Sequence, residues 1–413
     1  MKAIKSFLVA LIIFVLFILS AHMLISGKSL KVNGDKFGFW FNSYKNSSYN
    51  GIVQNMKDDT VLLMGSSELR YGRDSIYHPK NLFNGQDMSI MAVGAAFNAS
   101  LWHTICLGSI EPNLKSKKVI LMISPTWFKK DGIRSNAYAL RFSYMQYMAF
   151  MENPNIPEDI KEYVALRSEH LLKDDSNKLK NVRNINNINL KSRKAGIRSL
   201  YAMSKLYEVD KEYITLKSAI TFGKHSLIGE TPGSGVPAVK NLEWEKLQSM
   251  ANEKAKKQSG NVFYMRDKLW KRKIRKLFKA GLAGMHRRES YETSPEYADL
   301  EAFLQVCKSR GIRADLIILP VNGKYYDYTG MTKEKRAVVG TKVAKLAAKY
   351  GARCDNLSKH DYDRYITEDA VHPWGKGWLY IDEVIYDFYF RGSKGEALTA
   401  KLAEMRENYG RVG

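Results

Sequence analysis

A run of about 20 residues without a charged side chain, Ser6–Ile25, constrains the fold of this chain most strongly. As a helix it would be ~30 Å long, roughly the hydrocarbon thickness of a bilayer. Lys2 and Lys5 precede the run and favour a cytoplasmic N-terminus, although Lys28 and Lys31 follow it. Because no clear small-residue cleavage site follows, we predict an uncleaved membrane anchor, with removal as a signal peptide as the alternative. No second run of this length appears, so we place nearly all of the chain outside the cytoplasm.

The chain carries a strongly positive formal charge of +23, from 65 Lys and Arg against 42 Asp and Glu. Such a surface attracts nucleic acid, anionic lipid and anionic cell-wall polymers. An extracytoplasmic location excludes chromosomal nucleic acid, so we predict no nucleic-acid partner. The three cysteines lack a Cys-x-x-Cys pair, and the histidines form no cluster with ligand spacing. We therefore predict no metal and no cofactor.

Five short, mostly apolar segments predict the strands of one sheet. They lie at Thr60–Met64, Ser89–Val93, Lys118–Ser124, Ala314–Pro320 and Arg353–Leu357. Apolar runs of this kind suit parallel strands that are covered on both faces. Helices are predicted at Asn98–Gly108, Ser294–Gly311, Thr332–Tyr350 and Gly377–Phe388. Alternating strands and helices on both sides of a long intervening stretch indicate one α/β domain that is interrupted in the middle.

Changes in composition along the chain predict its domain boundaries. We expect a cytoplasmic tip and anchor at 1–27, a juxtamembrane linker at 28–57, the first part of the α/β domain at 58–128, a basic and mainly helical insertion at 129–290, the second part of the α/β domain at 291–390, and a tail at 391–413. In the basic segment 270–279 of the insertion, the apolar residues would share one stripe, namely Trp270, Ile274, Leu277 and Phe278. This segment is either a solvated helix docked by its stripe or a face for lipid headgroups or polyphosphate.

Two segments carry candidate catalytic residues. In Gly65-Ser66-Ser67, a predicted strand runs into a helix start, where glycine permits a tight bend and helix amides stabilise negative charge. A serine at such a turn is also a common helix N-cap. In Asp369-Ala-Val-His372, the carboxylate can reach the imidazole and orient it as a general base. Taken alone, this pair could also be a surface aspartate and a buried histidine.

Together the two segments resemble the outer blocks of the SGNH hydrolases, which have a flavodoxin-like parallel sheet flanked by helices. Ser67 then corresponds to the nucleophile, and Ser66 stands where that superfamily usually has Asp. Pro320–Gly330 is similar to the Pro-Val-Asn-Gly-Lys-Trp-Tyr-Asp-Tyr-Thr-Gly signature of the DltD family, the D-alanyl transfer proteins of teichoic acid D-alanylation. Ser124–Phe128 and Ser100–His103 also resemble segments of that family.

The resemblance implies an extracellular enzyme, anchored in the cell membrane of a Gram-positive bacterium, that esterifies lipoteichoic or wall teichoic acid with D-alanine. The implied partners are the polymer and a membrane-bound O-acyltransferase system that delivers the D-alanyl donor. Ser67 would form an acyl-serine intermediate, with His372 as its base and Asp369 as the orienting carboxylate. Candidate oxyanion or substrate-binding residues are Ser66, Gly94, Asn98, Trp127, Asn322 and Lys324.

Two other functions stay open. Another cell-wall SGNH enzyme, an O-acetylesterase or a lipase, would keep the triad but needs neither the basic insertion nor the Pro320–Gly330 signature. A non-catalytic scaffold that binds teichoic acid would explain the charge and the anchor, but not the ordered set of Ser67, Asp369 and His372. Replacing Ser67 by Ala separates these classes, because a scaffold would keep its function and either enzyme would lose it.

Overall fold

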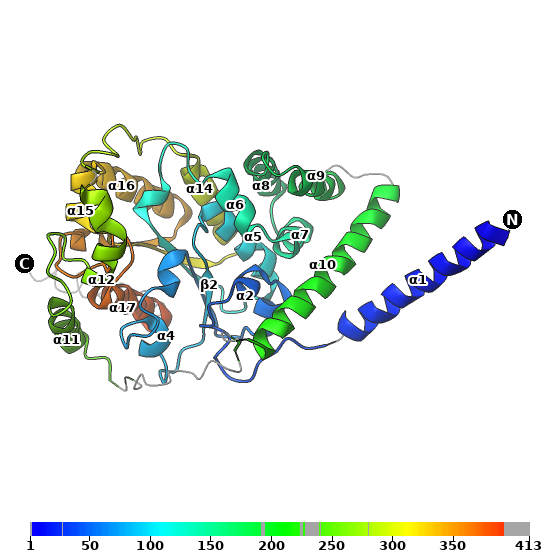
Figure 1. The fold of residues 1–413 in the computed structure, drawn as a ribbon, viewed down its shortest axis with the longest axis horizontal. Coiled ribbons are helices and arrows are strands. Elements are labelled where there is room, and N and C mark those ends of the chain that lie inside the picture. The colour runs from blue at the N-terminus through cyan, green and yellow to red at the C-terminus, as the bar shows by residue number, and fades with distance from the viewer. Residues whose placement is uncertain are drawn as a thin grey trace, which may run out of the picture.

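The computed structural model describes residues 2–26, 28–190, 195–223, 226–227, 239, 241–279 and 281–391, so the predicted tail at 391–413 lies outside them except for its first residue. The chain forms an α/β body with a five-stranded parallel sheet and one long apolar helix that extends from it (Figure 1). The strands are β1 Val61–Gly65, β2 Ile90–Gly94, β3 Lys118–Ile123, β4 Arg313–Ile318 and β5 Arg353–Asn356. The predicted fold class and the predicted strands are confirmed.

The order of the strands is β2-β1-β3-β4-β5, and every neighbouring pair is parallel. The carboxyl ends of the strands therefore meet at one edge of the sheet, where Gly65 of β1 lies opposite Gly94 of β2. The direction of the strand order changes beside β1. In open parallel sheets, such a switch point at the carboxyl edge is the usual place for a ligand.

Helices cover both faces of the sheet, and Figure 1 shows α14 and α16 on the opposite side of the body from α11 and α17. Alternate strand residues belong to two separate apolar clusters: Leu62 and Met64 lie in one, Val61 and Leu63 in the other. The first cluster includes residues of α5 Ser100–Ile110, α14 Pro295–Ser309 and α16 Lys333–Tyr350, and the second includes residues of α11 Trp244–Lys256 and α17 Gly375–Arg391. Burial on both faces explains why the strand sequences are continuously apolar.

Local sequence signals set the ends of these helices. The hydroxyl of Ser294 accepts a hydrogen bond from the N–H of Glu296 at the start of α14, and Pro295 occupies its first turn. Gly351 ends α16 with a left-handed φ of 70°. The other helices of the described part are α2 Ser43–Ser47, α3 Asn50–Gln54, α4 Pro79–Leu82, α6 Ser135–Arg141, α7 Tyr144–Glu152, α8 Glu158–Leu171, α9 Ser176–Leu190, α10 Ala195–Thr221, α12 Asp267–Leu269, α13 Arg275–Lys279 and α15 Gly323–Thr329.

The insertion between β3 and β4 is helical, as predicted, but it packs on both faces of the sheet. Helix α7 contacts α5 on one face, whereas α11 contacts α17 on the other. The basic segment 270–279 is docked by Trp270, Ile274 and Phe278, which pack in the cluster that contains Phe263. The side chain of Leu277 lies outside the described residues. The docked interpretation of this segment therefore holds for the apolar residues that are described.

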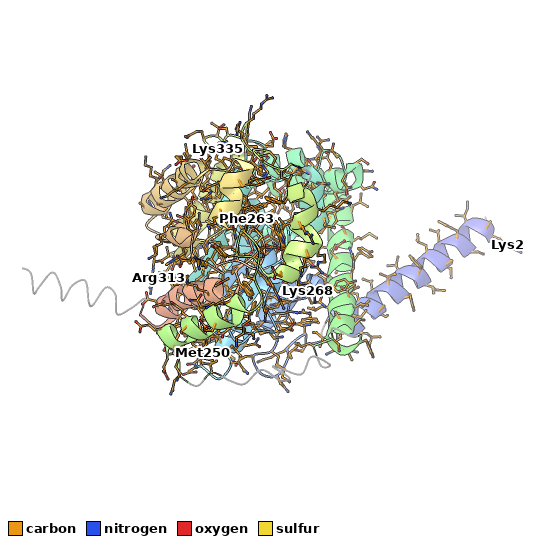
Figure 2. The ribbon with its side chains drawn as sticks, turned by 60° about the vertical axis from the view of Figure 1, so that its left-hand side comes forward. Lys2, Met250, Phe263, Lys268, Arg313 and Lys335 are labelled. Atoms are coloured by element: carbon orange, nitrogen blue, oxygen red, sulfur yellow. The ribbon has the colours of Figure 1, made fainter. Side chains whose placement is uncertain are left out.

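Helix α1, Lys2–Ser26, corresponds to the predicted anchor. Its span Lys2–Ile25 is long and apolar enough to cross a membrane, and the most apolar stretch of the span has no buried residue. Figures 1 and 2 both show α1 projecting away from the rest of the molecule. Near its C-terminal end, His22 Nδ1 lies 2.8 Å from Asp210 Oδ1 of α10. The anchor therefore contacts the body through a helix of the insertion.

The structure corrects the juxtamembrane linker that was predicted at 28–57. Phe37 and Trp40 are each 1% exposed, and the segment also contains α2 and α3. Lys45 is buried, and its Nζ donates hydrogen bonds to the carbonyl groups of Gly38 and Ala92, both at 2.6 Å. Burial lowers the pKa of Lys45 to about 7. Aromatic side chains and one buried lysine thus tie this polar segment to β2.

Candidate active site

Ser67, Asp369 and His372 meet at the carboxyl edge of the sheet. Ser67 begins a short 3₁₀ turn directly after β1, and the other two residues lie in the loop before α17. His372 Nε2 lies 2.8 Å from Ser67 Oγ. His372 Nδ1 lies 2.8 and 2.9 Å from the two carboxylate oxygens of Asp369. The structure thus brings together a hydroxyl, an imidazole and a carboxylate within hydrogen-bond distance.

Asp369 is 4% exposed, and burial by itself would raise the pKa of its carboxyl group. Contacts with the His372 ring and with the backbone N–H groups of Val371 and His372 outweigh burial and lower the pKa of Asp369 to about 2. An ionised carboxylate favours the tautomer in which Nδ1 of His372 carries the proton. Nε2 is then the nitrogen that can accept the Ser67 proton.

The turn around Ser67 explains the glycine in its motif. A Cβ at Gly65 would lie 2.5 Å from Glu68 Oε1 and 2.7 Å from Met122 Cε, so any larger residue would have to displace these side chains. The buried Glu68 carboxylate accepts a hydrogen bond from the N–H of Ser66 at 2.5 Å. Ser66 Oγ donates to the carbonyl of Ala95 at 3.2 Å. The hydroxyl of Ser66 therefore ties β1 to the loop after β2, and Ser67 is the serine that contacts the imidazole.

Two residues beside the triad were not found from the sequence motifs. The ring of Tyr71 stacks on the imidazole of His372, with centroids 3.5 Å apart and planes 4° apart. Lys273 Nζ donates to Tyr71 Oη at 2.7 Å and lies 3.4 Å from Asp369 Oδ2. Because Lys273 belongs to the basic segment 270–279, the insertion contributes directly to the surroundings of the triad.

Two predicted oxyanion residues, Gly94 and Asn98, lie in different settings at the end of β2 and in the loop after it. Gly94 is the last residue of β2, and a Cβ there would lie 2.1 Å from the carbonyl oxygen of Gly65. Its N–H already points to Asn46 Oδ1 at 3.4 Å. Asn98 is 1% exposed, and neither polar atom of its side chain has a partner in the described part of the chain. A buried donor without a partner is suited to a developing oxyanion, so Asn98 is the stronger candidate.

Trp127 lies in the turn after β3, at the same edge of the sheet, and is partly exposed. Its ring centroid is 5.9 Å from that of His103 on α5. Burial lowers the pKa of His103 to about 3, so this histidine is neutral. Trp127 stays a candidate for the wall of the site, and His103 packs against it.

Asn322 and Lys324 follow β4 and lie in different surroundings. Asn322 caps α15: its Oδ1 accepts from the N–H of Tyr325, and its Nδ2 donates to a backbone carbonyl at 2.9 Å. The N–H of Asn322 donates to the carbonyl of Ala370, next to the triad carboxylate, at 2.9 Å. Asn322 therefore holds the loop that carries Asp369 and His372 against the start of α15. Lys324 is exposed, with Nζ 4.4 Å from the centroid of the Tyr264 ring, where an acidic ligand could reach it.

The chemistry that these groups can perform is acyl transfer through an ester on Ser67. The hydroxyl has a base beside it, and the base has an ionised carboxylate on its far side. Over the ranges that the structure describes, no group of three or more His, Cys, Asp or Glu side chains is arranged to hold a metal ion.

Comparison with known proteins gives one family. The DltD protein family matches residues 41–390, a range that contains the whole sheet and the three triad residues. The chain is 32% identical to Protein DltD of Bacillus subtilis (strain 168) over 351 residues, 82% of this chain and 85% of that protein. It is 28% identical to Protein DltD of Staphylococcus aureus (strain NCTC 8325 / PS 47) over 332 residues, 78% of this chain and 79% of that protein. It is 23% identical to Protein DltD of Lacticaseibacillus rhamnosus over 353 residues, 81% and 78% of the two chains.

Proposed function

Because this chain belongs to the DltD family, whose members act in teichoic acid D-alanylation, we propose that it is the serine acyltransferase of that process. The observation that carries the proposal is the hydrogen-bonded series Ser67, His372 and Asp369. The donor is an activated D-alanyl ester that a membrane-bound O-acyltransferase system supplies. The acceptor is a hydroxyl of lipoteichoic or wall teichoic acid. Helix α1 holds the catalytic body at the outer face of the cell membrane.

The reaction has two steps, and His372 moves one proton in each. Ser67 Oγ attacks the carbonyl of the donor ester, its proton passes to His372 Nε2, and the leaving group departs with that proton. A hydroxyl of the polymer then transfers its proton to His372 and attacks the acyl-serine. Ser67 leaves with that proton and is a free hydroxyl again. Ionised Asp369 stabilises the imidazolium in both steps, and the side-chain amide of Asn98 is the candidate donor to the oxyanion.

Two alternatives use the same molecule differently. An O-acetylesterase or lipase of the SGNH type would keep the triad, and the family match over residues 41–390 favours D-alanyl transfer over both. A non-catalytic scaffold would account for the charge of +23 and for the anchor. It does not explain the contact of 2.8 Å between His372 Nε2 and Ser67 Oγ. A loss of function on replacing Ser67 would distinguish the enzymes from the scaffold. The acyl group whose amount changes, D-alanyl or another ester, would distinguish the enzymes from each other.

The test is complementation of cells that lack this protein, with D-alanine released from both teichoic acids by mild base and quantified. We expect Ser67→Ala and His372→Ala to leave only the D-alanine of the empty-vector control. Ser309→Ala, which changes an exposed serine of α14, is the matched control and should restore the wild-type content. A wild-type content with Ser67→Ala would favour the scaffold. A loss of O-acetyl or lipid esters with D-alanine unchanged would favour another SGNH esterase.

A further inference from the structure

A basic pocket of about 260 Å³ lies beside the candidate triad. The cationic side chains that line it are Arg70, Arg266, Lys268 and Arg272. Arg70 ends the 3₁₀ turn that Ser67 begins, and the other three belong to the insertion, in and around α12. Lys268 is labelled in Figure 2. The insertion and the nucleophile turn thus form this pocket together.

The positive charge of the pocket is largely uncompensated. Arg266 Nη1 lies 3.2 Å from Glu368 Oε2. Arg70, Lys268 and Arg272 are exposed and have no ion-pair partner in the part of the chain that the structure describes. Like charges that line one concave surface repel each other unless an anion binds between them. The pocket is therefore suited to an anionic ligand.

Two residues that line the pocket also contact the candidate triad or adjoin it in the chain. Tyr71 lines the pocket and stacks on His372. Glu368 also lines the pocket, directly precedes Asp369, and donates its N–H to the carbonyl of His372 at 2.9 Å. An anion in the pocket would therefore lie next to the group that activates Ser67.

We propose that this pocket is a subsite for a phosphodiester of the acceptor polymer and that it holds the polymer with a neighbouring hydroxyl toward Ser67. The inference rests on the proposed function, because it concerns the acceptor of the acyl group. Guanidinium groups bind phosphate oxygens through paired hydrogen bonds, and Arg70 and Arg272 supply two such groups. Lys268 adds a third positive charge. A phospholipid headgroup offers the same phosphate chemistry and is the competing ligand.

The test is the binding of a synthetic poly(glycerol phosphate) oligomer to the full chain in uncharged detergent, measured by isothermal titration calorimetry. All proteins carry Ser67→Ala, so that no acyl transfer occurs during the titration. Binding of the oligomer does not need the Ser67 nucleophile, and labelling of Ser67 with a fluorophosphonate probe does not need the oligomer. Loss of oligomer binding therefore tests the subsite, and loss of labelling tests the proposed function.

The pocket variant is R70Q/K268Q/R272Q. The matched control, K271Q/R275Q/K276Q, removes the same charge from exposed residues of the same segment that do not line the pocket. We expect the pocket variant to weaken binding at least about tenfold and the control no more than about threefold. Equal losses, or no loss in the pocket variant, would overturn the subsite. If the triple variant does not fold, Arg272→Gln alone should weaken binding about threefold, and unchanged binding would overturn the proposal.

A second arm separates the polymer from a lipid headgroup. The full chain is placed in nanodiscs of phosphatidylcholine, with or without phosphatidylglycerol, and titrated with the same oligomer. If the pocket variant weakens oligomer binding to the same extent in both kinds of nanodisc, the result would support the polymer as the ligand of the pocket. A difference between the pocket variant and its control that disappears when phosphatidylglycerol is present would assign the pocket to the lipid headgroup and overturn the proposal.

Discussion

Tyr71 links the candidate triad to Lys273 of the insertion. Its ring covers one face of the His372 imidazole, and its hydroxyl accepts a hydrogen bond from Lys273. Stacking limits tilting of the imidazole, which the two hydrogen bonds within its plane do not prevent. Lys273 Nζ also lies 3.4 Å from Asp369 Oδ2. In the proposed mechanism, both residues should therefore influence how readily Ser67 reacts.

Replacing Lys273 by Met tests whether this lysine positions Tyr71 on the imidazole. The variant removes the hydrogen bond to Tyr71 Oη, so the ring that stacks on His372 is held less firmly. We expect about tenfold slower fluorophosphonate labelling of Ser67 at neutral pH. Lys276→Met, in an exposed position of the same segment, is the control. Equal labelling rates of the two variants would contradict this role for Lys273.

The low pKa of Asp369, about 2, predicts a pH dependence of stability. Because the pKa is lower in the folded protein than in the unfolded chain (about 3.9), this carboxylate stabilises the fold at higher pH, and the contribution is lost as the pH falls through about 2. Asp369→Asn should remove about 2 kcal/mol of this acid-dependent stability. Denaturant unfolding of both proteins at pH values from about 5 to about 2 measures it. Parallel losses in the two proteins would contradict the assignment.

The three residues of the candidate triad were predicted from the sequence, but their surroundings appear only in the fold. Ser67 follows a strand and a glycine, and Asp369 and His372 are three positions apart; each segment alone left a structural alternative open, and the resemblance to the SGNH hydrolases joined them. The hydrogen bond between Lys273 and Tyr71 joins positions 202 residues apart and depends on how the insertion folds back. Asn322 was predicted to bind substrate, whereas its cap on α15 appears only in the structure.

Among the secondary-structure elements, the strands are the most predictable because burial on both faces leaves little choice of residue. Strand β1, for example, was expected at Thr60–Met64 and is observed at Val61–Gly65. The packing of the insertion was not predictable, because an apolar stripe on α7 or α11 does not say which face of the sheet it will cover. The segment 28–57 was predicted to be a linker because most of its residues are polar. Its few aromatic residues, which prove to be buried, were given too little weight in that prediction.

Gly94 provides a test at the level of strand packing. A Cβ at Gly94 would lie 2.1 Å from the carbonyl oxygen of Gly65 on the neighbouring strand, so Gly94→Ala must push β1 and β2 apart. We expect a loss of about 3 kcal/mol in the free energy of unfolding, measured with denaturant. In the control Gly260→Ala, the added Cβ would meet Asp267 Oδ2 at an ordinary 3.5 Å. Equal stability of the two variants would contradict this packing.

The whole molecule combines an apolar helix with a basic body, and the contact between His22 and Asp210 links them. If α1 spans the membrane with its N-terminus in the cytoplasm, the charge of +23 belongs almost entirely to the outer side. There it can attract anionic polymers without competition from chromosomal nucleic acid. The topology is therefore part of the functional proposal and can be tested by itself.

Single engineered cysteines report the topology in intact cells. Cys354, the partly exposed native cysteine, is first replaced by Ser. We expect a membrane-impermeant maleimide to label Lys359→Cys, an exposed position of the body, and to label Ala3→Cys at the tip of α1 only after permeabilisation. The reverse pattern would contradict an extracytoplasmic catalytic body.

The account depends most on Ser67 being an activated nucleophile. The most direct measurement treats the full chain in detergent with a fluorophosphonate probe and locates the adduct by peptide mass spectrometry. We predict one adduct, on Ser67, that His372→Ala abolishes, because Nε2 of this histidine accepts the proton of the attacking hydroxyl. A folded protein that forms no adduct, or forms it on another residue, would contradict the proposed mechanism.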